Sequence, residues 1–442
     1  MRVGIIGGGP AGTVCALSLL RGAARRGQRH EVLLFDGKSF LQIGPRGCNM
    51  CAGVIPATLL DRLAEMGVPV PPEVIQRTVT GHYFETLAGG VHVPKDPDAK
   101  ICTVFRSAGP RGSEPLVDQS FDQLLLGGAQ AAGAVHIHSH VTEVALPSGA
   151  DAPFRLRTTD GGQHEVDVVV GAFGVNSALA RRFERLGFGY RRPGTYQACQ
   201  ADLPVDDRFL EERHRGEIRI FSLALPGIRF GALTPKRRHV TVTVIGPRPT
   251  RADLERFLNH PRVRHHFPEG WELPLLYCTC HPWLPVTAAR SPVADRLLVI
   301  GDANISRYLK GGIESAFFTG ALAAEMILSG RLSRAELVRG YVRPCHARYR
   351  YDNLYGRVLF AANDLISRLP LVARAGLWLV DREQRIPDWR ARRHTRLLWH
   401  IFTGDAPYRR IAREALDPRS LAPALWALLL SAAGRVRRHA TE

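Results

Sequence analysis

Six residues near the N-terminus have the types and spacing that bind a dinucleotide. Gly7, Gly9 and Gly12 form a Gly-x-Gly-x-x-Gly motif, and Pro10 and Ala11 lie between its last two glycines. In such a motif the first glycine allows a tight turn and the second lets the backbone approach a pyrophosphate. The third lets a helix pack closely on a strand, and the N-terminus of that helix offers N–H groups to the phosphates.

The elements predicted around this motif are those that it requires. Residues 2–6 read as a short buried strand, residues 13–20 have helical apolar spacing, and residues 31–35 form a second strand. That strand ends at Asp36, whose carboxylate can accept hydrogen bonds from a ribose. Because an acid there disfavours a 2′-phosphate, the sequence predicts FAD or NAD rather than NADP.

A Gly-Asp pair far along the chain indicates which dinucleotide is bound. Residues 296–303 read as a buried strand that ends near Gly301 and Asp302, and residues 314–328 read as a helix. Three residues precede or open that helix: Gly311, Gly312 and Ile313. An Asp at a strand end can hold the ribityl chain of a flavin, and the glycines let the backbone approach its ring. This segment resembles the flavoprotein hydroxylases, whose FAD domain is assembled from distant segments.

A third segment, residues 168–177, resembles the Asp-Gly motif of the same enzymes, but Phe173 replaces its Asp. The resemblance implies that this acid contacts the FAD pyrophosphate and a pyridine nucleotide. The absence of this acid argues against NAD(P)H binding in the manner of the hydroxylases. The chain has no second Gly-x-Gly-x-x-Gly motif, which argues against a separate NAD domain of the glutathione-reductase type. We therefore expect a transiently bound electron donor, either NAD(P)H or a reduced carrier protein.

The stretch Cys51-Ala52-Gly53 resembles the Cys-x-Gly-Gly motif of the geranylgeranyl reductase family, with Val54 in place of the second glycine. The resemblance runs from about residue 1 to residue 341 and includes Phe121-Asp122; residues 399–404 look like the family's tail. It implies an FAD enzyme in which Gly53 lies at the cofactor and Cys51 lies beside the flavin. Cys51 then shapes the pocket or donates a proton after hydride transfer; the alternative is a small residue that packs under the ring.

Two departures from the family concern the cofactor and the substrate. Gln119 stands where the family has an Arg that helps to hold FAD, and Arg106 or Arg111 are candidate substitutes. The family's aromatic prenyl-pocket motif has its nearest match in a mostly aliphatic stretch. From this match we expect a hydrophobic substrate pocket of altered shape, lined by Phe221, Leu223, Leu225, Pro226 and Gly231.

Other reactive side chains have a structural and a functional interpretation. Cys48 with Cys51, and Cys278 with Cys280 and His281, can hold zinc or a cluster if the fold joins them, or the first pair can act as a thiol relay. The structural interpretation is favoured, and we predict no metal. Two further residues after the Gly-Asp pair can reach the flavin or a substrate anion, or lie in a solvated loop: Tyr308 and Lys310.

The chain has 442 residues, 45% hydrophobic and 23% charged, which excludes collagen, coiled coil and wholesale disorder. Its length predicts two or three lobes. We expect an α/β fold with a Rossmann-type FAD-binding domain, an antiparallel β substrate domain and a helical C-terminal region. The expected boundaries are 1–75, 100–180 and 285–335 for the first, 76–99 and 181–284 for the second, and 336–442 for the third.

The formal charge of +18 is concentrated at the C-terminal end. Residues 331–442 contain 22 Arg and 10 Asp or Glu, a net charge of +12. A GC-rich genome produces such a bias without function; the functional interpretation is a surface for acidic lipid or an acidic partner. The apolar residues 421–433 are too few to span a bilayer, so they either pack in a core or lie on a membrane surface.

These observations predict an FAD-dependent oxidoreductase that transfers a hydride from reduced flavin to a C=C bond of a hydrophobic or lipid-like substrate. The alternatives are an FAD-dependent monooxygenase and a non-catalytic lipid-binding or escort protein on the same fold. We expect reduced cysteines and a cytoplasmic protein, with peripheral membrane contact through the basic region. No feature indicates a nucleic-acid partner.

Overall fold

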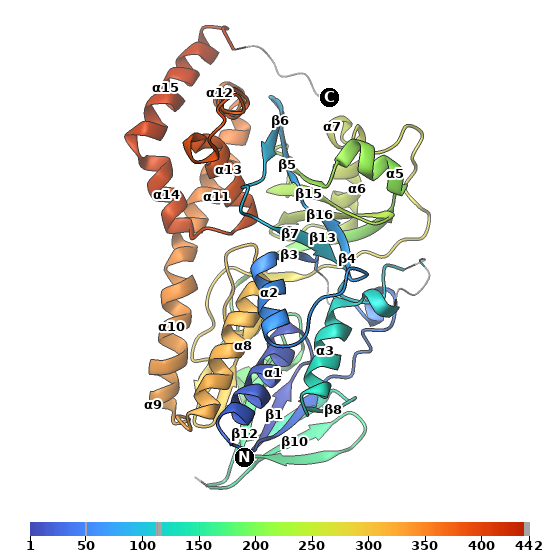
Figure 1. Ribbon diagram of the computed structural model, residues 1–442, viewed down its shortest axis with the longest axis vertical. Coiled ribbons are helices and arrows are strands. Elements are labelled where there is room, and N and C mark those ends of the chain that lie inside the picture. Colours follow the sequence, from blue (N-terminus) through green and yellow to red (C-terminus); the bar gives the residue numbers. More distant parts are fainter. Residues whose placement is uncertain (49–50, 112, 114–116, 150, 437–442) are drawn as a thin grey trace.

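The computed structural model describes residues 1–48, 51–111, 113, 117–149 and 151–436 (Figure 1). A six-stranded sheet with the order β18–β19–β12–β1–β2–β8 supports the N-terminal motif. Its neighbouring strands are parallel, except for the antiparallel pair β18 and β19. The strands are β1 (Arg2–Ile6), β2 (Glu31–Phe35), β8 (Val135–Ile137), β12 (Val168–Gly171), β18 (Val293–Ala294) and β19 (Leu297–Val299). Residues from three distant stretches of the chain thus form one sheet.

Both faces of this sheet are covered, which explains why its central strands are continuous apolar runs. One face packs against α1 (Pro10–Arg25), α3 (Phe121–Ala131) and α8 (Gly312–Leu328). The other packs against a small antiparallel sheet of β9 (Val141–Ala145), β10 (Phe154–Thr158) and β11 (Gln163–Val166). The predicted Rossmann-type α/β fold is confirmed.

A seven-stranded sheet forms the second lobe, in the order β17–β13–β16–β15–β14–β5–β6. Its pairs are antiparallel except β14 with β5. The strands are β5 (Gly81–Thr86), β6 (Gly89–Pro94), β13 (Thr195–Pro204), β14 (Glu217–Ser222), β15 (Phe230–Lys236), β16 (His239–Gly246) and β17 (Trp283–Pro285). One face packs against α6 (Arg251–Leu258) and α7 (Pro261–Arg264), and the opposite face packs against C-terminal helices.

The segment between the two lobes contains a short sheet of β3 (Val54–Pro56), β7 (Ile101–Val104) and β4 (Ile75–Thr78), with α2 (Ala57–Glu65) following β3. Figure 1 shows β3 between the two lobes, and the Cys51 stretch directly precedes this strand. Two short helices, α4 (Leu179–Arg185) and α5 (Asp207–Phe209), lie in connections.

The C-terminal region is helical, as expected from its pattern. It contains α9 (Arg334–Leu337), α10 (Arg343–Cys345), α11 (Asp352–Arg368), α12 (Pro370–Glu383), α13 (Arg393–Thr403), α14 (Tyr408–Leu416) and α15 (Pro418–Ala432). Helices α11 and α12 are separate, because Pro370 lacks the N–H that a continuous helix needs. None of the described helices combines the length and hydropathy that crossing a bilayer requires.

Candidate active site

A cavity of about 1520 Å³ is lined by residues of both large sheets and of the C-terminal helices. Pockets for single small molecules usually measure roughly 300–1,000 Å³. This cavity therefore has room for a cofactor and a second molecule together. Some of the residues predicted from the sequence to form a site line this cavity, and others do not.

The N-terminal turn lines one part of the cavity through Gly7, Gly9, Pro10, Ala11 and Asp36. Asp36 accepts hydrogen bonds from the Gly8 N–H at 2.7 Å and the Lys38 N–H at 2.8 Å. A carboxylate has about four acceptor positions, so Asp36 can hold the turn and still accept from a ligand hydroxyl.

Gly12 does not line the cavity but determines the shape of the turn. A Cβ atom at this position would lie 1.9 Å from the carbonyl oxygen of Gly7. Any side chain would therefore push α1 away from the turn, and the helix N-terminus would no longer meet the cavity at Pro10 and Ala11.

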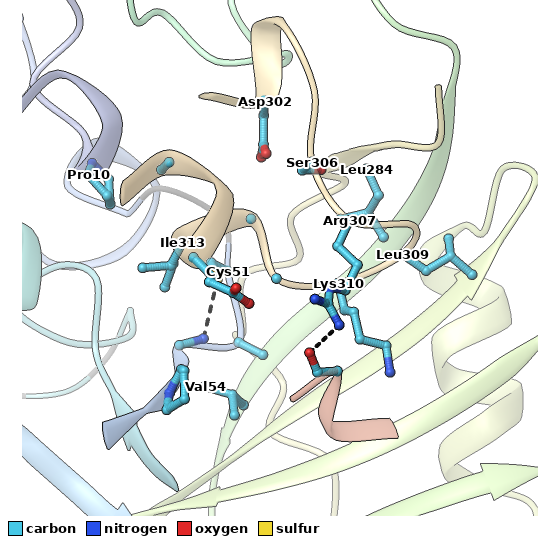
Figure 2. A pocket seen from close by; sticks show the side chains of 18 of the residues that line it. Pro10, Cys51, Val54, Leu284, Asp302, Ser306, Arg307, Leu309, Lys310 and Ile313 are labelled. Atoms are coloured by element: carbon cyan, nitrogen blue, oxygen red, sulfur yellow. Dashed lines mark hydrogen bonds between the residues drawn. The ribbon is translucent and has the colours of Figure 1, made fainter. Parts of the chain in front are cut away.

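The Gly-Asp segment lies on the same cavity, although it is nearly 300 residues away. Asp302 lines it together with four neighbours: Gly301, Gly311, Gly312 and Ile313. Figure 2 shows Pro10, Asp302 and Ile313 around the space where α1 and α8 begin. Two helix N-termini thus open onto one cavity, and each favours an anionic group.

Asp302 has acceptor capacity that the protein leaves unused. Its Oδ1 atom is buried and finds no hydrogen-bond partner among the described residues. Burial raises the pKa of this carboxyl to about 6, although a hydrogen bond with Ser306 and the charge of Arg106 act in the opposite direction. An orphaned buried oxygen of this kind fits a ligand hydroxyl such as that of a ribityl chain.

Cys51 and Gly53 also line the cavity, and Figure 2 shows Cys51 and its neighbour Val54. Gly53 has a φ of +73°, and a Cβ atom there would lie 2.0 Å from the carbonyl oxygen of Val104. The motif therefore needs glycine at this position. The Gly53 N–H donates to Cys51 Sγ at 3.4 Å, which fixes the thiol at the cavity wall.

Arg106 supplies a buried cation in the same wall. Its Nε donates to Asp122 Oδ1 at 2.5 Å and its Nη2 donates to Asp122 Oδ2 at 2.8 Å. Burial opposes its charge, but Asp122 outweighs burial and raises the pKa of the guanidinium. Arg106, rather than Arg111, lines the cavity, while Gln119 accepts a hydrogen bond from Gln76 at 2.8 Å.

The other part of the cavity is a face of the seven-stranded sheet that carries apolar side chains together with His82, Gln200, Thr234 and Thr243. It is lined by Ile218, Ile220, Phe230, Ala232 and Ile245. The residues predicted for a substrate pocket lie away from this cavity, because they belong to the opposite face of the sheet or follow the end of β14. None of the five lines the cavity: Phe221, Leu223, Leu225, Pro226 and Gly231.

The physical reason is the two-residue period of a strand. Phe221 packs edge-on against Phe257 of α6, with ring centroids 5.5 Å apart. A Cβ atom at Gly231 would lie 2.4 Å from the same ring. A shift of one residue along β14 or β15 moves a side chain from this core to the cavity, which is why Ile220 and Phe230 line it instead.

The tail stretch 399–404 forms a third wall that sequence reasoning named without assigning a role. His400 Nδ1 lies 2.6 Å from Asp405 Oδ1, and Trp399 Nε1 donates to Asp405 Oδ2 at 2.8 Å. Burial would raise the pKa of Asp405, but these contacts and one from Thr403 outweigh it and lower the pKa to about 2. His82 stacks on Trp399, and burial lowers its pKa to about 3.

Lys310 lines the cavity, whereas Tyr308 is buried behind it. The Lys310 ammonium donates to the Ile401 carbonyl and lies over the rings of Phe360 and Phe402. Burial and the charge of Arg307 lower the pKa of Lys310 well below its usual range. Tyr308 accepts a hydrogen bond from Arg229 at 2.8 Å.

The remaining candidates do not form a metal centre. Among the described residues, no group of three or more His, Cys, Asp or Glu side chains can hold a metal ion. Cys280 and His281 lie outside the cavity lining, and Cys280 pairs through its backbone with Gln200. Phe173, which replaces the motif acid, lines the cavity and packs against Phe183.

No family model matches this chain. Geranylgeranyl diphosphate reductase from the chloroplast of Nicotiana tabacum is 25% identical over 347 residues, which are 75% of this chain and 66% of that protein. The protein of the same name from Synechocystis sp. is 24% identical over 341 residues, which are 74% of this chain and 75% of that protein. This chain is similar to the geranylgeranyl reductases. The resemblance predicted from its motifs is confirmed.

Solved structures agree on the fold. A geranylgeranyl bacteriochlorophyll reductase-like protein from Thermoplasma acidophilum has a TM-score of 0.65 at 18% identity, covering 94% of this chain and 98% of that one. A flavin-dependent brominase has the same TM-score at 17% identity and covers 99% of this chain and 100% of that one. The same fold therefore occurs in proteins whose names indicate different reactions.

Proposed function

We propose that this relative of the geranylgeranyl reductases is an FAD-dependent oxidoreductase that reduces a C=C bond in a hydrophobic, prenyl-type substrate. The observation that supports the proposal is the continuity of one cavity, in which a dinucleotide-binding turn leads to an apolar sheet face. FAD, when bound, supplies the hydride from its reduced flavin. The residues of the chain bind, orient and protect the reacting groups.

The first part of the cavity fits FAD by its donors and acceptors. The backbone of residues 7–11 and the N-terminus of α1 suit a pyrophosphate, and Asp36 suits a ribose hydroxyl. Asp302 Oδ1 is a buried acceptor without a protein partner among the described residues, which suits the hydroxyls of a ribityl chain. The electron donor in this proposal is NAD(P)H or a reduced carrier protein that binds transiently.

The second part of the cavity fits an apolar chain. Ile218, Ile220 and Phe230 come from the adjacent strands β14 and β15 and present apolar side chains to the cavity that Cys51 also lines. Burial of apolar area is worth roughly 25 cal/mol per Å², so this surface can retain a lipid-like substrate. It also excludes water from the reacting carbon atoms.

Cys51 is the proposed proton donor. Hydride addition to one carbon of a C=C bond must be completed by a proton on the other carbon. Cys51 Sγ is held at the cavity wall by the Gly53 N–H, and the Arg106 guanidinium interacts electrostatically with it. A thiol in this position can donate the proton and return to its neutral form from solvent.

Anaerobic half-reaction measurements test the proposal. Purified protein loaded with FAD is reduced with dithionite, and geranylgeranyl diphosphate is added, with its fully saturated analogue as the control. We expect flavin reoxidation with the unsaturated compound alone, and a product heavier by two hydrogen atoms per reduced bond. Absence of reoxidation with any polyene, while oxygen and a substrate together give a hydroxylated product, would establish the monooxygenase alternative. A colourless protein that refuses FAD and retains lipid would establish the escort alternative.

A further inference from the structure

Helix α15 exposes its large apolar side chains and buries its small ones. Leu421, Leu425, Trp426 and Leu429 are 41%, 62%, 60% and 63% exposed. The side chains that it buries are Ser420, Ala427 and Ser431. A helix that covers a soluble core has the opposite arrangement. The outward face of α15 is therefore apolar like a binding surface, and none of the described residues covers it.

A second set of exposed apolar side chains lies next to this helix. The Ser431 hydroxyl donates to the Leu371 carbonyl at 3.0 Å, so the end of α15 lies against the start of α12. Four exposed apolar residues belong to the end of α11 and the start of α12: Leu365, Ile366, Leu369 and Leu371. We name these four together with the four of α15 the apolar face. Figure 1 shows α15 at the outer edge of the molecule, and α12 packs against β6 on its other side.

Positive charge borders the apolar face. The fifteen residues between Arg419 and Arg435 include no charged residue, and both arginines are exposed. The neighbouring helix α14 adds exposed Arg409 and Arg413. A second copy of this chain could cover the apolar side chains, but it would bring these arginines toward arginines of the same kind. Anionic lipid headgroups complement both features at once.

We propose that the apolar face binds the surface of a bilayer that contains anionic lipids. A helix of 15 residues is roughly 22 Å long at 1.5 Å per residue, which is shorter than the hydrocarbon core, so α15 lies along the surface. Leu425 and Leu429 insert among the acyl chains, Trp426 lies at the headgroup level and the arginines contact lipid phosphates.

This binding would bring the cavity close to the membrane. Helix α14 packs against α15 and carries Arg410, which lines the cavity. The wall formed by α13 and α14 is therefore the side of the cavity nearest the lipid. Membrane binding of this kind does not depend on the proposed reaction, because it requires no turnover.

Vesicle flotation with the full-length protein, in the absence of substrate and reductant, tests the proposal. The vesicles consist of phosphatidylcholine alone or of phosphatidylcholine with 30% phosphatidylglycerol. We expect flotation with the anionic vesicles and at least fivefold less with the neutral ones. The double variant Leu425→Ser/Leu429→Ser should lower binding to anionic vesicles at least tenfold. The matched control is Leu275→Ser/Leu276→Ser, whose side chains are 96% and 90% exposed elsewhere, and it should bind like the unmodified protein.

A spectroscopic readout shows whether α15 itself enters the lipid. Vesicles with doxyl-labelled lipids should quench part of the protein fluorescence, and the Trp426→Phe variant should lose that part. Equal flotation of the unmodified protein and the Leu425/Leu429 variant would overturn the proposal. The absence of flotation with anionic vesicles would also overturn it. If light scattering then shows a dimer that the Leu425/Leu429 variant dissociates, the occupant of the apolar face is a second copy of this chain.

Discussion

The guanidinium of Arg106 and the carboxylate of Asp122 form a two-pronged ion pair that is buried in the wall of the cavity. The pair links β7, whose C-terminal end precedes Arg106, to the first turn of α3. It holds β7 and α3 together, and it keeps a positive charge at the cavity without a net buried charge.

Removal of Asp122 should leave that positive charge unpaired. We expect Asp122→Ala to lower the free energy of unfolding by about 3–5 kcal/mol, as measured by urea denaturation. The matched control is Arg155→Ala, which breaks the exposed pair with Glu165 and should change stability by less than about 1 kcal/mol. Similar losses for the two variants would show that the buried pair has no special role in stability.

Substitution of Cys51 should separate catalysis from cofactor binding. The Cys51→Ala variant removes only the Sγ atom, so we expect normal FAD content and a rate of substrate-dependent reoxidation reduced by roughly 10²- to 10⁴-fold, the usual contribution of a general acid. Cys278→Ala, outside the cavity lining, serves as the control and should retain the rate. An unchanged rate in Cys51→Ala would leave this residue with a packing role.

The raised pKa of Asp302 predicts the pH dependence of apoprotein stability. The folded protein holds this proton up to about pH 6, while the unfolded chain releases it near the ordinary value of 3.8. The free energy of unfolding should therefore fall as pH rises from about 4 to 6 and then stay level. At 1.36 kcal/mol per pKa unit, the total decrease is up to about 3 kcal/mol.

The Asp302→Asn variant should lack that decrease. Its apoprotein should be more stable than the unmodified apoprotein at pH 7.5 and similar to it at pH 4, while its affinity for FAD falls. Thermal denaturation at the two pH values and FAD titration measure the two effects. A decrease of the same size in the variant would assign the pH dependence to another group.

Adjacent residues of β14 should give opposite results when substituted. Ile220→Trp extends a side chain into the cavity, so we expect weaker binding of a prenyl substrate with FAD content retained. Phe221→Ala empties a packed site against α6 and should cost about 3–5 kcal/mol of stability with little change in substrate KM. Denaturation and steady-state kinetics on both variants distinguish the two faces of the sheet.

The glycine turn and the Gly-Asp pair could be predicted because local backbone geometry demands those residue types. The close approach of Gly12 to Gly7 leaves no room for a side chain, whatever the rest of the chain does. The apolar wall could not be predicted in the same way. Both faces of β14 are buried, so hydrophobicity alone does not distinguish Ile220 from Phe221, and the choice depends on which helix packs on which face.

Other parts of the site depend on contacts between distant segments. Arg106 could be named as a candidate, but its pairing with Asp122 follows from the position of α3 rather than from any spacing rule. Asp405 follows a recognised tail stretch, yet its role as acceptor for His400 and Trp399 required the fold. Polar side chains buried by tertiary contacts have no periodic signal in the sequence.

The cavity takes its walls from residue 6 through residue 410, so it cannot exist in a partly synthesised chain. During translation the glycine turn and β1 leave the ribosome long before β19, α8 and α13, and most of the pairings that enclose the cavity join residues far apart in sequence. The complete cavity can therefore form only after α14 has been synthesised. Premature termination anywhere before α14 would yield a product without a closed binding chamber.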